Sequence, residues 1–525
     1  MNDTPAFESR LVRTHPRIVT VAPTGAFPAN TDETSTWSAV DIRFNDYPSS
    51  ILSARYMKIG MVSLGCPKNL VDSEVMLGLA QQAGHQLTRD AADADVLVVN
   101  TCAFIDKARQ ESIDAILEMA EHKKNGKCQT LVVTGCMAER YRDELRAEIP
   151  EIDAVLGTGE VPEIVAAFGG PASGGSPSGN PPYVQLLRSN GEAVVPRAQR
   201  PEPRALPTYI YDADTPRLLA TPRHYAYVKI AEGCDYKCAF CIIPTLRGKY
   251  RSRPADSIVR EAEMLAAGGV KELLLISQDT SFYGNDRGER GALARLLRAL
   301  NRVDGLEWIR MLYLYPTTIG DDVLDAMAES EKVCKYIDLP LQHASDAVLK
   351  RMKRPGTRAS YERLLDRIRT RVPNVALRTT FIAGFPGETD AEFDQLQSFV
   401  KETRFDHVGV FTYSDEVGTS AHDLPDDVPA RTKRQRQSRI MSLQKRVVAR
   451  AQKDRVGQHV RMVIDGPSSE HELVIKGRLE GQAPDIDPVV YLTDCDPSEF
   501  SAGSFIDAEI VGSREYDLVA RPTSA

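Results

Sequence analysis

Between residues 57 and 168, short apolar runs alternate with longer amphipathic stretches, which predicts strands followed by helices. The strand-like runs are Lys58–Leu64, Asp95–Asn100 and Thr130–Thr134, and the helical stretches are 70–83, 106–122 and 138–148. Strands that alternate with helices usually pair in parallel, with the helices covering the faces of the sheet. We therefore expect an N-terminal parallel α/β domain at 57–168.

A second α/β pattern occupies residues 220–449. Its six strand-like runs are Tyr225–Ala231, Glu272–Ser277, Trp308–Leu314, Tyr336–Leu339, Ala376–Ala383 and Val408–Thr412. Helical segments separate most of them, and six βα units predict an open (β/α)6 barrel, a smaller relative of the eight-stranded barrel. The stretch 431–450 reads as a basic helix with no acidic residue.

Beyond the basic helix, residues 450–518 change to the alternation that is typical of strands. Five short runs in this region predict a small all-β barrel that resembles an oligonucleotide-binding fold. The fold class expected for the whole chain is therefore α/β multi-domain, with a small β-barrel at its C-terminal end.

Two segments show neither the helical nor the strand periodicity of apolar residues. Residues 1–56 are polar and are expected to be a disordered leader, and Met57 is a candidate for the true start of translation. Residues 169–219 are rich in Pro, Gly and Ser and are expected to be a flexible linker or insertion. No run approaches the roughly 18 apolar residues of a membrane span, and no signal peptide is evident, so we expect a cytoplasmic protein.

The chain has nine cysteines, and in a long intracellular protein these favour metal binding or catalysis over disulfides. Cys234, Cys238 and Cys241 follow the first barrel strand in the sequence CDYKCAFC. Three thiolates at this spacing hold three irons of a 4Fe–4S cubane and leave the fourth iron open. The alternative is a structural zinc site, which needs four ligands, and no fourth Cys or His lies nearby in the sequence.

Cys66, Cys102 and Cys136 are widely separated, yet each stands just past a strand of the N-terminal domain, in VSLGC, LVVNTC and LVVTGC. Successive parallel strands end at one edge of the sheet, where ligand sites of open α/β sheets lie. These three thiols are therefore expected to converge as a second three-cysteine site. The alternative is three ordinary buried cysteines. Cys128, Cys334 and Cys495 show no such placement and are assigned to the core or to chance.

The CxxxCxxC spacing is the hallmark of the radical S-adenosylmethionine (SAM) superfamily, and the resemblance extends from residue 57 to about 518, apart from 169–220. Further stretches carry it: GCDYKCAFCIIPTLRGKYRSRP, LLLISQDTSFYG, IDLPLQHASDAVLKRMKR, FIAGFPGETD and FTYSDEVGTSAHDLPD. Together they resemble the radical SAM methylthiotransferase family, in which the small C-terminal barrel is called TRAM.

The resemblance implies two 4Fe–4S clusters, one in the N-terminal domain and one in the barrel, with SAM as cosubstrate. One SAM supplies the radical, another supplies the methyl group, and the N-terminal cluster carries or delivers sulfur, so that C–H becomes C–SCH3. It also implies that Phe240, Gln278 and the segment from Gly384 to Glu388 line the SAM site. For that last segment, GFPGE, the alternative is a turn that caps a strand.

Two branches of this family differ in substrate, namely an aspartate of small-subunit ribosomal protein S-twelve or an adenosine of tRNA. Residues 450–518 hold 14 Asp and Glu against 7 Lys and Arg, whereas a barrel that binds RNA should be basic. An acidic barrel suits a basic ribosomal protein, although a solvated acidic face without a partner is the alternative. The basic helix at 431–450 complicates this charge argument, because it could either brace the fold or contact rRNA.

Two further motifs resemble the ribosomal-protein branch. One is Tyr413–Thr419, with the acid pair Asp415 and Glu416, and the other is LPLQHAS with His343, which is alternatively a hydrogen-bonded barrel histidine. We therefore predict methylthiolation of the aspartate β-carbon, with tRNA adenosine as the alternative substrate. Expected partners are ribosomal protein S-twelve, in the assembled subunit or free, and a reducing donor such as flavodoxin or ferredoxin.

Other classes of protein fit the sequence less well. An electron carrier with two clusters usually completes each cluster with four cysteines, and here each group has three. The net charge of −8 disfavours a nucleic-acid module that binds through its whole surface. The expected protein is a monomeric enzyme without a membrane partner.

Overall fold

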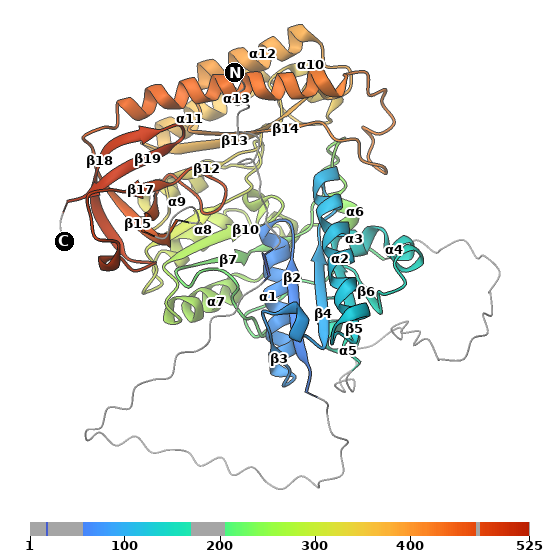
Figure 1. Ribbon diagram of the computed structural model, residues 1–525. Coiled ribbons are helices and arrows are strands. Elements are labelled where there is room, and N and C mark those ends of the chain that lie inside the picture. Colours follow the sequence, from blue (N-terminus) through green and yellow to red (C-terminus); the bar gives the residue numbers. More distant parts are fainter. Residues whose placement is uncertain (1–16, 19–55, 170–204, 469–472, 524–525) are drawn as a thin grey trace, which may run out of the picture.

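The computed structural model describes residues 17–18, 56–169, 205–468 and 473–523. They form three regions, a parallel sheet, an open barrel and a small closed barrel, with a long helix across the last two (Figure 1). Apart from residues 17–18 and 56, the expected leader lies outside the described residues, as do residues 170–204 of the expected linker. Among the described helices, none has the length and apolar character needed to cross a bilayer.

The N-terminal sheet is parallel, as predicted. Its strands β2 (Lys58–Ser63), β4 (Val96–Thr101), β5 (Thr130–Gly135) and β6 (Ala154–Leu156) pair in that order. The two-residue strands β1 (Arg17–Ile18) and β3 (Gln86–Leu87) both pair with β2, β1 in the antiparallel sense. The sequence pattern missed β3 and β6, which are too short for a period to be visible.

The helices of this domain are α1 (Pro67–Gln82), α2 (Asp106–Asn125), α3 (Cys136–Arg140), α4 (Arg142–Glu148) and α5 (Ile164–Ala167). The single helix predicted at 138–148 is wrong, because Tyr141 adopts φ −119° and ψ 35° and separates α3 from α4. Helix α1 is buried on nearly all sides, and its polar residues Asp72 and Glu74 bind Arg247 of the barrel and Arg217 of the segment before it. Such all-round burial is expected of a helix between two packed units.

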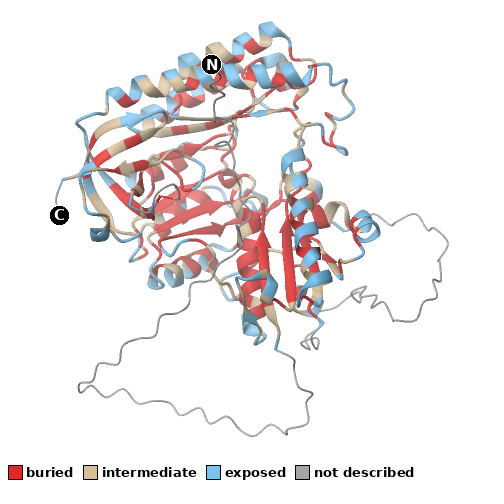
Figure 2. Cartoon of the chain, viewed as in Figure 1, coloured by how far each residue is buried: buried red, intermediate tan, exposed pale blue. Residues whose placement is uncertain are grey.

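The open barrel has the six predicted strands. They are β7 (Tyr225–Lys229), β10 (Glu272–Ile276), β11 (Trp308–Met311), β12 (Tyr336–Asp338), β13 (Ala376–Ala383) and β14 (His407–Thr412). Parallel pairing runs β7-β10-β11 and β12-β13-β14, and a parallel bridge between Ile309 and Val333 joins the two halves. In Figure 2 the strands are mostly buried, with exposed residues on the covering helices.

The covering helices are α7 (Ala255–Ala267), α8 (Ala292–Leu300), α9 (Asp321–Glu329), α10 (Asp346–Arg351), α11 (Arg358–Arg371) and α12 (Asp390–Thr403). Short elements β8 (Ala231–Glu232), α6 (Ile243–Arg247) and β9 (Arg251–Ser252) follow β7. The expected basic helix is α13 (Ala430–Lys453), which packs along β14 and α12 and reaches the C-terminal barrel (Figure 1). Its Arg436 binds Glu388 and Asp390, so α13 braces the barrel.

The C-terminal region is a closed five-stranded barrel, as predicted. Its strands β15 (His459–Pro467), β16 (Ile475–Leu479), β17 (Val490–Leu492), β19 (Asp517–Pro522) and β18 (Phe505–Arg514) pair in this cyclic order. All pairs are antiparallel except β17 with β19. Closure leaves no free sheet edge, which suits so small a unit.

The C-terminal barrel seals the end of the open barrel where its strands begin. Asp487 accepts a hydrogen bond from the Tyr336 hydroxyl at 2.7 Å, and Asp485 accepts one from the Tyr225 hydroxyl at 3.1 Å. The Glu480 carboxylate accepts the amide of Lys335, and Asp465 bonds His224. These four acids bond groups of the open barrel, so the acidity counted in the sequence overstates what this region offers a partner.

Residues 205–219, which were expected to belong to a flexible linker, pack as a strap between α1 and α7. Arg217 bonds Glu74 of α1 at 2.6 Å and Glu261 of α7 at 2.5 Å, and all three side chains are almost fully buried. The hydroxyl of the buried Tyr211 also donates to Glu261. The strap therefore fixes the N-terminal sheet against the open barrel.

Candidate active site

The six cysteines singled out in the sequence lie where strands end. Cys66, Cys102 and Cys136 follow β2, β4 and β5, and we call them the sheet triad. Cys234, Cys238 and Cys241 follow β7 and β8, and we call them the barrel triad. Both triads lie at the carboxyl ends of parallel strands, where α/β folds place their sites.

Glycines let the chain turn sharply into the sheet triad. Gly65 has φ +86°, and a Cβ placed there would lie 2.7 Å from Cβ of Cys102. Gly135 has φ +93°, and a Cβ there would lie 2.5 Å from the carbonyl oxygen of Thr101. The Gly-Cys pairs thus bring the ends of the three strands close together.

The sheet triad is a group of mutually interacting thiols, of which Cys102 and Cys136 are buried and Cys66 is partly buried. Burial raises the pKa of Cys102 well above its ordinary value, and the charges of Cys136 and Cys66 raise it further. Burial likewise raises the pKa of Cys136, against a lowering effect from Arg247, which lies 3.6 Å from its sulfur. Thiolates in such a place need positive charge, as iron would provide.

The barrel triad lies in a loop that aromatic rings hold in place. Burial raises the pKa of Cys234 to about 11 and that of Cys241 to about 12. Arg354 donates to the sulfur of Cys238 at 3.7 Å, and the Tyr315 hydroxyl lies 3.9 Å from that sulfur. The rings of Tyr236 and Tyr315 stack with centroids 3.9 Å apart.

These donor sets suit a cluster better than a single ion. Within the described part of the chain, no three His, Cys, Asp or Glu side chains are close enough to surround one metal ion. In a cubane each thiolate binds a different iron, so its cysteines stand apart around the cluster. Three thiols at each place are the donor set of an iron–sulfur cluster with one open iron, whereas a structural zinc site takes four ligands.

A buried network of charges joins the domain of the sheet triad to the open barrel. Arg247 of α6 bonds Asp72 of α1 at 2.7 Å. It also contacts Asn69 of α1 and the sulfur of Cys136, a member of the sheet triad. Lys229 bonds Asp72 and Glu232, and Arg247 lies 3.3 Å from Glu232. Two cations and two carboxylates balance each other here, so the N-terminal domain and the barrel meet through a neutral buried cluster.

Lys68 is a further buried cation, two residues after Cys66. Its Nζ lies 3.1 Å from the ring centroid of Tyr313, which follows β11. Burial lowers the pKa of Lys68 to about 8, and the charge of Cys66 opposes this shift. The roles of Lys68, Tyr313 and Arg247 were not predicted from the sequence. The only local signal for them was that they lie close in sequence to a cysteine motif or to the end of a strand.

The residues predicted to line the SAM site all lie at the strand ends. Phe240 packs at the edge of a small core with Phe385 and Tyr413. The Gln278 amide donates to Glu232, while its Oε1 is enclosed without a partner in the described structure. That unpaired oxygen is available to a ligand, so a role of Gln278 in SAM binding stays a prediction.

The GFPGE segment is a tight turn after β13. The Glu388 carboxylate accepts the amide of Gly384 at 2.7 Å and a bond from Arg436 at 3.0 Å. Gly384 has φ +76°, and a Cβ there would lie 2.3 Å from Cγ of Lys433. The turn alternative thus explains Glu388 and Gly384 by themselves, and their contact with SAM stays a prediction.

The two motifs that favoured the ribosomal-protein branch have structural roles. His343 is fully buried and accepts the amide of Ser345 at 3.0 Å, as expected for a hydrogen-bonded barrel histidine. Glu416 is buried and binds Arg109 of α2 at 2.7 Å and Arg140 of α3. The motif Tyr413–Thr419 therefore fastens the end of the open barrel to the N-terminal domain.

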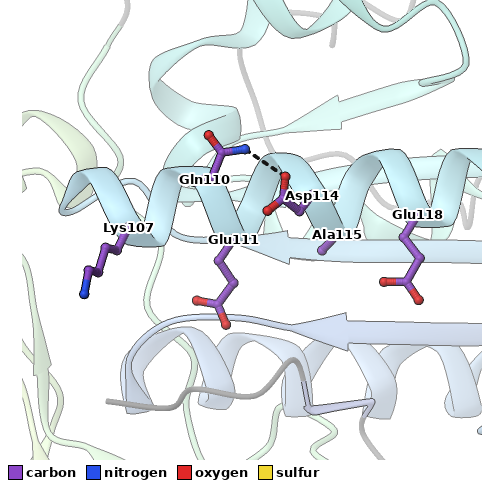
Figure 3. A pocket seen from close by; sticks show the side chains of 6 residues that line it. All are labelled: Lys107, Gln110, Glu111, Asp114, Ala115 and Glu118. Carbon is purple, nitrogen blue, oxygen red and sulfur yellow. Dashed lines mark hydrogen bonds between the residues drawn. The ribbon is translucent and has the colours of Figure 1, made fainter. Parts of the chain in front are cut away.

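The hollow shown in Figure 3 lies away from both triads. It has a volume of about 410 Å³ and is lined by residues of α2 alone: Lys107, Gln110, Glu111, Asp114, Ala115 and Glu118. The bond from Gln110 to Asp114 lies along the helix surface (Figure 3). It contains none of the predicted site residues and adds nothing to the site.

Comparison with family models assigns each region. Residues 58–157 match Uncharacterized protein family UPF0004, residues 228–400 match the Radical SAM superfamily, and residues 456–522 match the TRAM domain. A chain with this barrel and a cysteine triplet after its first strand is a radical SAM enzyme, and it therefore uses SAM and a 4Fe–4S cluster.

Three relatives are each called ribosomal protein uS12 methylthiotransferase RimO. The protein of Koribacter versatilis is 47% identical over 88% of this chain and 96% of its own. Those of Trichlorobacter lovleyi and Myxococcus xanthus are 45% and 47% identical, over 88% of this chain and 97% and 90% of theirs. The chain belongs to this family of radical SAM methylthiotransferases, which confirms the predicted enzyme class.

Among solved structures, the radical SAM methyltransferase TsrM from Kitasatospora setae aligns with a TM-score of 0.47 at 16% identity. That alignment covers 68% of this chain and 72% of TsrM.

Proposed function

We propose that this enzyme inserts a methylthio group at the β-carbon of an aspartate in ribosomal protein uS12. The observation that carries the proposal is that the sheet triad and the barrel triad belong to two domains joined by a neutral buried cluster of charges, in a chain whose relatives are named for this modification. A tRNA substrate is not favoured, since the similar relatives above carry the ribosomal-protein name.

We further propose two 4Fe–4S clusters. The barrel triad would hold the one that binds SAM, and the sheet triad would hold the second. When bound, SAM would supply a 5′-deoxyadenosyl radical and a methyl group, and the cluster of the sheet triad would supply sulfur. Phe240 and Gln278 are proposed to orient SAM, together with the backbone of the turn from Gly384 to Glu388.

The remaining residues position and shield the reacting groups. The Tyr315 ring, which stacks on Tyr236, places its hydroxyl beside Cys238 of the barrel triad, and Cys102 and Cys136 of the sheet triad are buried. Because Arg217, Arg247 and Glu416 join the two domains, the substrate must enter between two units whose separation is fixed. A fixed distance between the two domains is required if groups held by both triads are to react at one substrate carbon.

We propose that the enzyme is a monomer, works in the cytoplasm where ribosomes are assembled, and takes electrons from a small carrier such as flavodoxin or ferredoxin. The acids left exposed on the C-terminal barrel, including Asp494, Asp496 and Glu499, complement a basic ribosomal protein. Because fewer acids are exposed than the sequence count suggested, the proposed substrate rests more on the names of the relatives than on the charge of this barrel.

Mass spectrometry of small-subunit proteins and tRNA nucleosides tests the substrate. In cells that lack this protein, uS12 should lose the mass of one methylthio group while the tRNA nucleosides stay unchanged. A plasmid copy should restore the mark, and a copy with Cys238→Ala should not. Loss of a methylthio group from tRNA adenosine with uS12 unaltered would contradict the proposed substrate.

Glu416→Gln tests whether the domain contact matters for sulfur insertion. Removing the carboxylate leaves Arg109 and Arg140 without their shared partner, which should cost about 1–3 kcal/mol of stability. Loosened domains should lower methylthiolation on the order of 10-fold, because small misplacements slow reactions between positioned groups. SAM cleavage without uS12 should change little, since it needs the barrel alone.

The matched control for Glu416→Gln is Asp415→Asn. Asp415 is the neighbouring acid, is exposed, and bonds His422 rather than the N-terminal domain. Both activities should survive in this variant. Equal loss of SAM cleavage and methylthiolation in Glu416→Gln would show that the contact supports folding only.

A further inference from the structure

Lys68 is a buried cation that makes no ion pair or side-chain hydrogen bond with any described residue, although the charges of Cys66, Glu232 and Asp338 act on it from farther away. Lys68 is only 8% exposed, and its Nζ contacts the ring of Tyr313. Within the described residues, no hydrogen-bond acceptor or carboxylate lies within bonding distance of that Nζ. By contrast, the buried Lys229 and Arg247 each bind Asp72 and Glu232.

The helix that carries Lys68 adds to this positive charge. Helix α1 is 16 residues long, and its N-terminal end has no capping side chain and no acidic residue in the first turn. Unpaired amide groups at a helix N-terminus attract anions, and the helix dipole reinforces them. Lys68 stands in the first turn of this helix, after the N-cap residue Cys66, and both its ammonium and the helix N-terminus favour negative charge nearby.

This place lies between the two triads. Lys68 stands two residues after Cys66 of the sheet triad and touches Tyr313. Two residues further along the same strand end, Tyr315 lies 3.9 Å from the sulfur of Cys238 in the barrel triad. A substrate carbon that reacts with groups held by both triads must pass here.

We propose that Lys68 binds the side-chain carboxylate of the target aspartate and so positions its β-carbon between the triads. The inference rests on the proposed function, since it requires an aspartate as substrate. A buried ammonium without a directly bonded partner is costly, and a carboxylate from the substrate supplies that partner. Binding through the carboxylate leaves the adjacent β-carbon free to react.

The test compares uS12 carrying the target aspartate with uS12 carrying asparagine there. Binding to the loaded enzyme with SAM, without reductant, is measured by fluorescence anisotropy. The wild-type enzyme should prefer aspartate by about 10- to 100-fold, as expected of a charged hydrogen bond. In Lys68→Met the preference should fall to within about 2-fold, and Lys68→Arg should keep an intermediate preference.

Controls separate this role from support of the clusters. Lys68→Met should keep its iron content, its visible spectrum and its SAM cleavage without uS12. The matched control Lys107→Met, at an exposed lysine of α2, should behave as wild type. An unchanged aspartate preference in Lys68→Met overturns the proposal, and so does loss of iron from Lys68→Met and Lys68→Arg alike. A wild-type enzyme that neither binds nor modifies uS12 would instead overturn the proposed function, and this inference with it.

Discussion

Cys238→Ala is expected to abolish reductive cleavage of SAM, whereas Cys102→Ala should retain cleavage and abolish methylthiolation of uS12. The reason is the division of the six thiols into two triads in two domains, each with its own burial and partners. SAM needs an open iron next to the barrel triad, so removing a thiol there removes both activities. Removing a thiol of the sheet triad spares the barrel.

The measurement is anaerobic turnover with reductant, following 5′-deoxyadenosine and modified uS12 by mass spectrometry. Each variant should also lose up to about half of the bound iron, because one cluster of two is disturbed. Cys495→Ala is the control, since this cysteine lies in the C-terminal barrel away from both triads. Normal methylthiolation by Cys102→Ala would show that the sheet triad holds no required cluster.

The barrel and the sheet were predictable because their signals are local. Six apolar runs separated by amphipathic helices gave the strands β7 and β10 to β14; the spacing of Cys234, Cys238 and Cys241 marked the barrel triad, and the position of a cysteine just after each strand marked the sheet triad. Parallel strands end together, so residues such as Cys66 and Cys136 converge although 70 residues separate them. The pattern was weaker where elements are short, as at β6 and at the break between α3 and α4.

The strap and the charged contacts were not predictable, because their partners are distant in sequence. Residues 205–219 have the composition of a loop, and only Glu74 and Glu261 make Arg217 an interior residue. Likewise, nothing near Lys68 shows that Tyr313 covers it. Counting acids in the C-terminal barrel overestimated its surface charge, since Asp487 and Asp485 bond the open barrel.

Glu272→Gln is expected to destabilise the protein by about 3–5 kcal/mol, the cost of removing one partner from a buried ion pair. Glu272 begins β10 and is fully buried, with Arg310 at 2.8 Å and Arg478 of the C-terminal barrel at 2.7 Å. Arg478 keeps Asp465, but Arg310 is left without a carboxylate among the described residues. The change therefore leaves a buried guanidinium uncompensated where two barrels meet.

Urea unfolding followed by tryptophan fluorescence measures this effect, since Trp308 lies at the same interface and packs against Phe505. Glu329→Gln is the matched control, because its ion pair with Arg298 is largely exposed and should contribute less than about 1 kcal/mol. An equally small effect in Glu272→Gln would show that the two barrels are held by apolar packing instead.

Acid should reduce the difference between wild type and Glu272→Gln. Burial acts to raise the pKa of Glu272, but the charges of Arg478 and Arg310 outweigh it and lower the pKa below its ordinary value of 4.5. The ionised carboxylate therefore contributes its stability above that ordinary value, and the contribution is lost as the pH falls through the lowered pKa. A difference that instead shrank as the pH rose from 5 toward neutrality would contradict an ionised Glu272 at this interface.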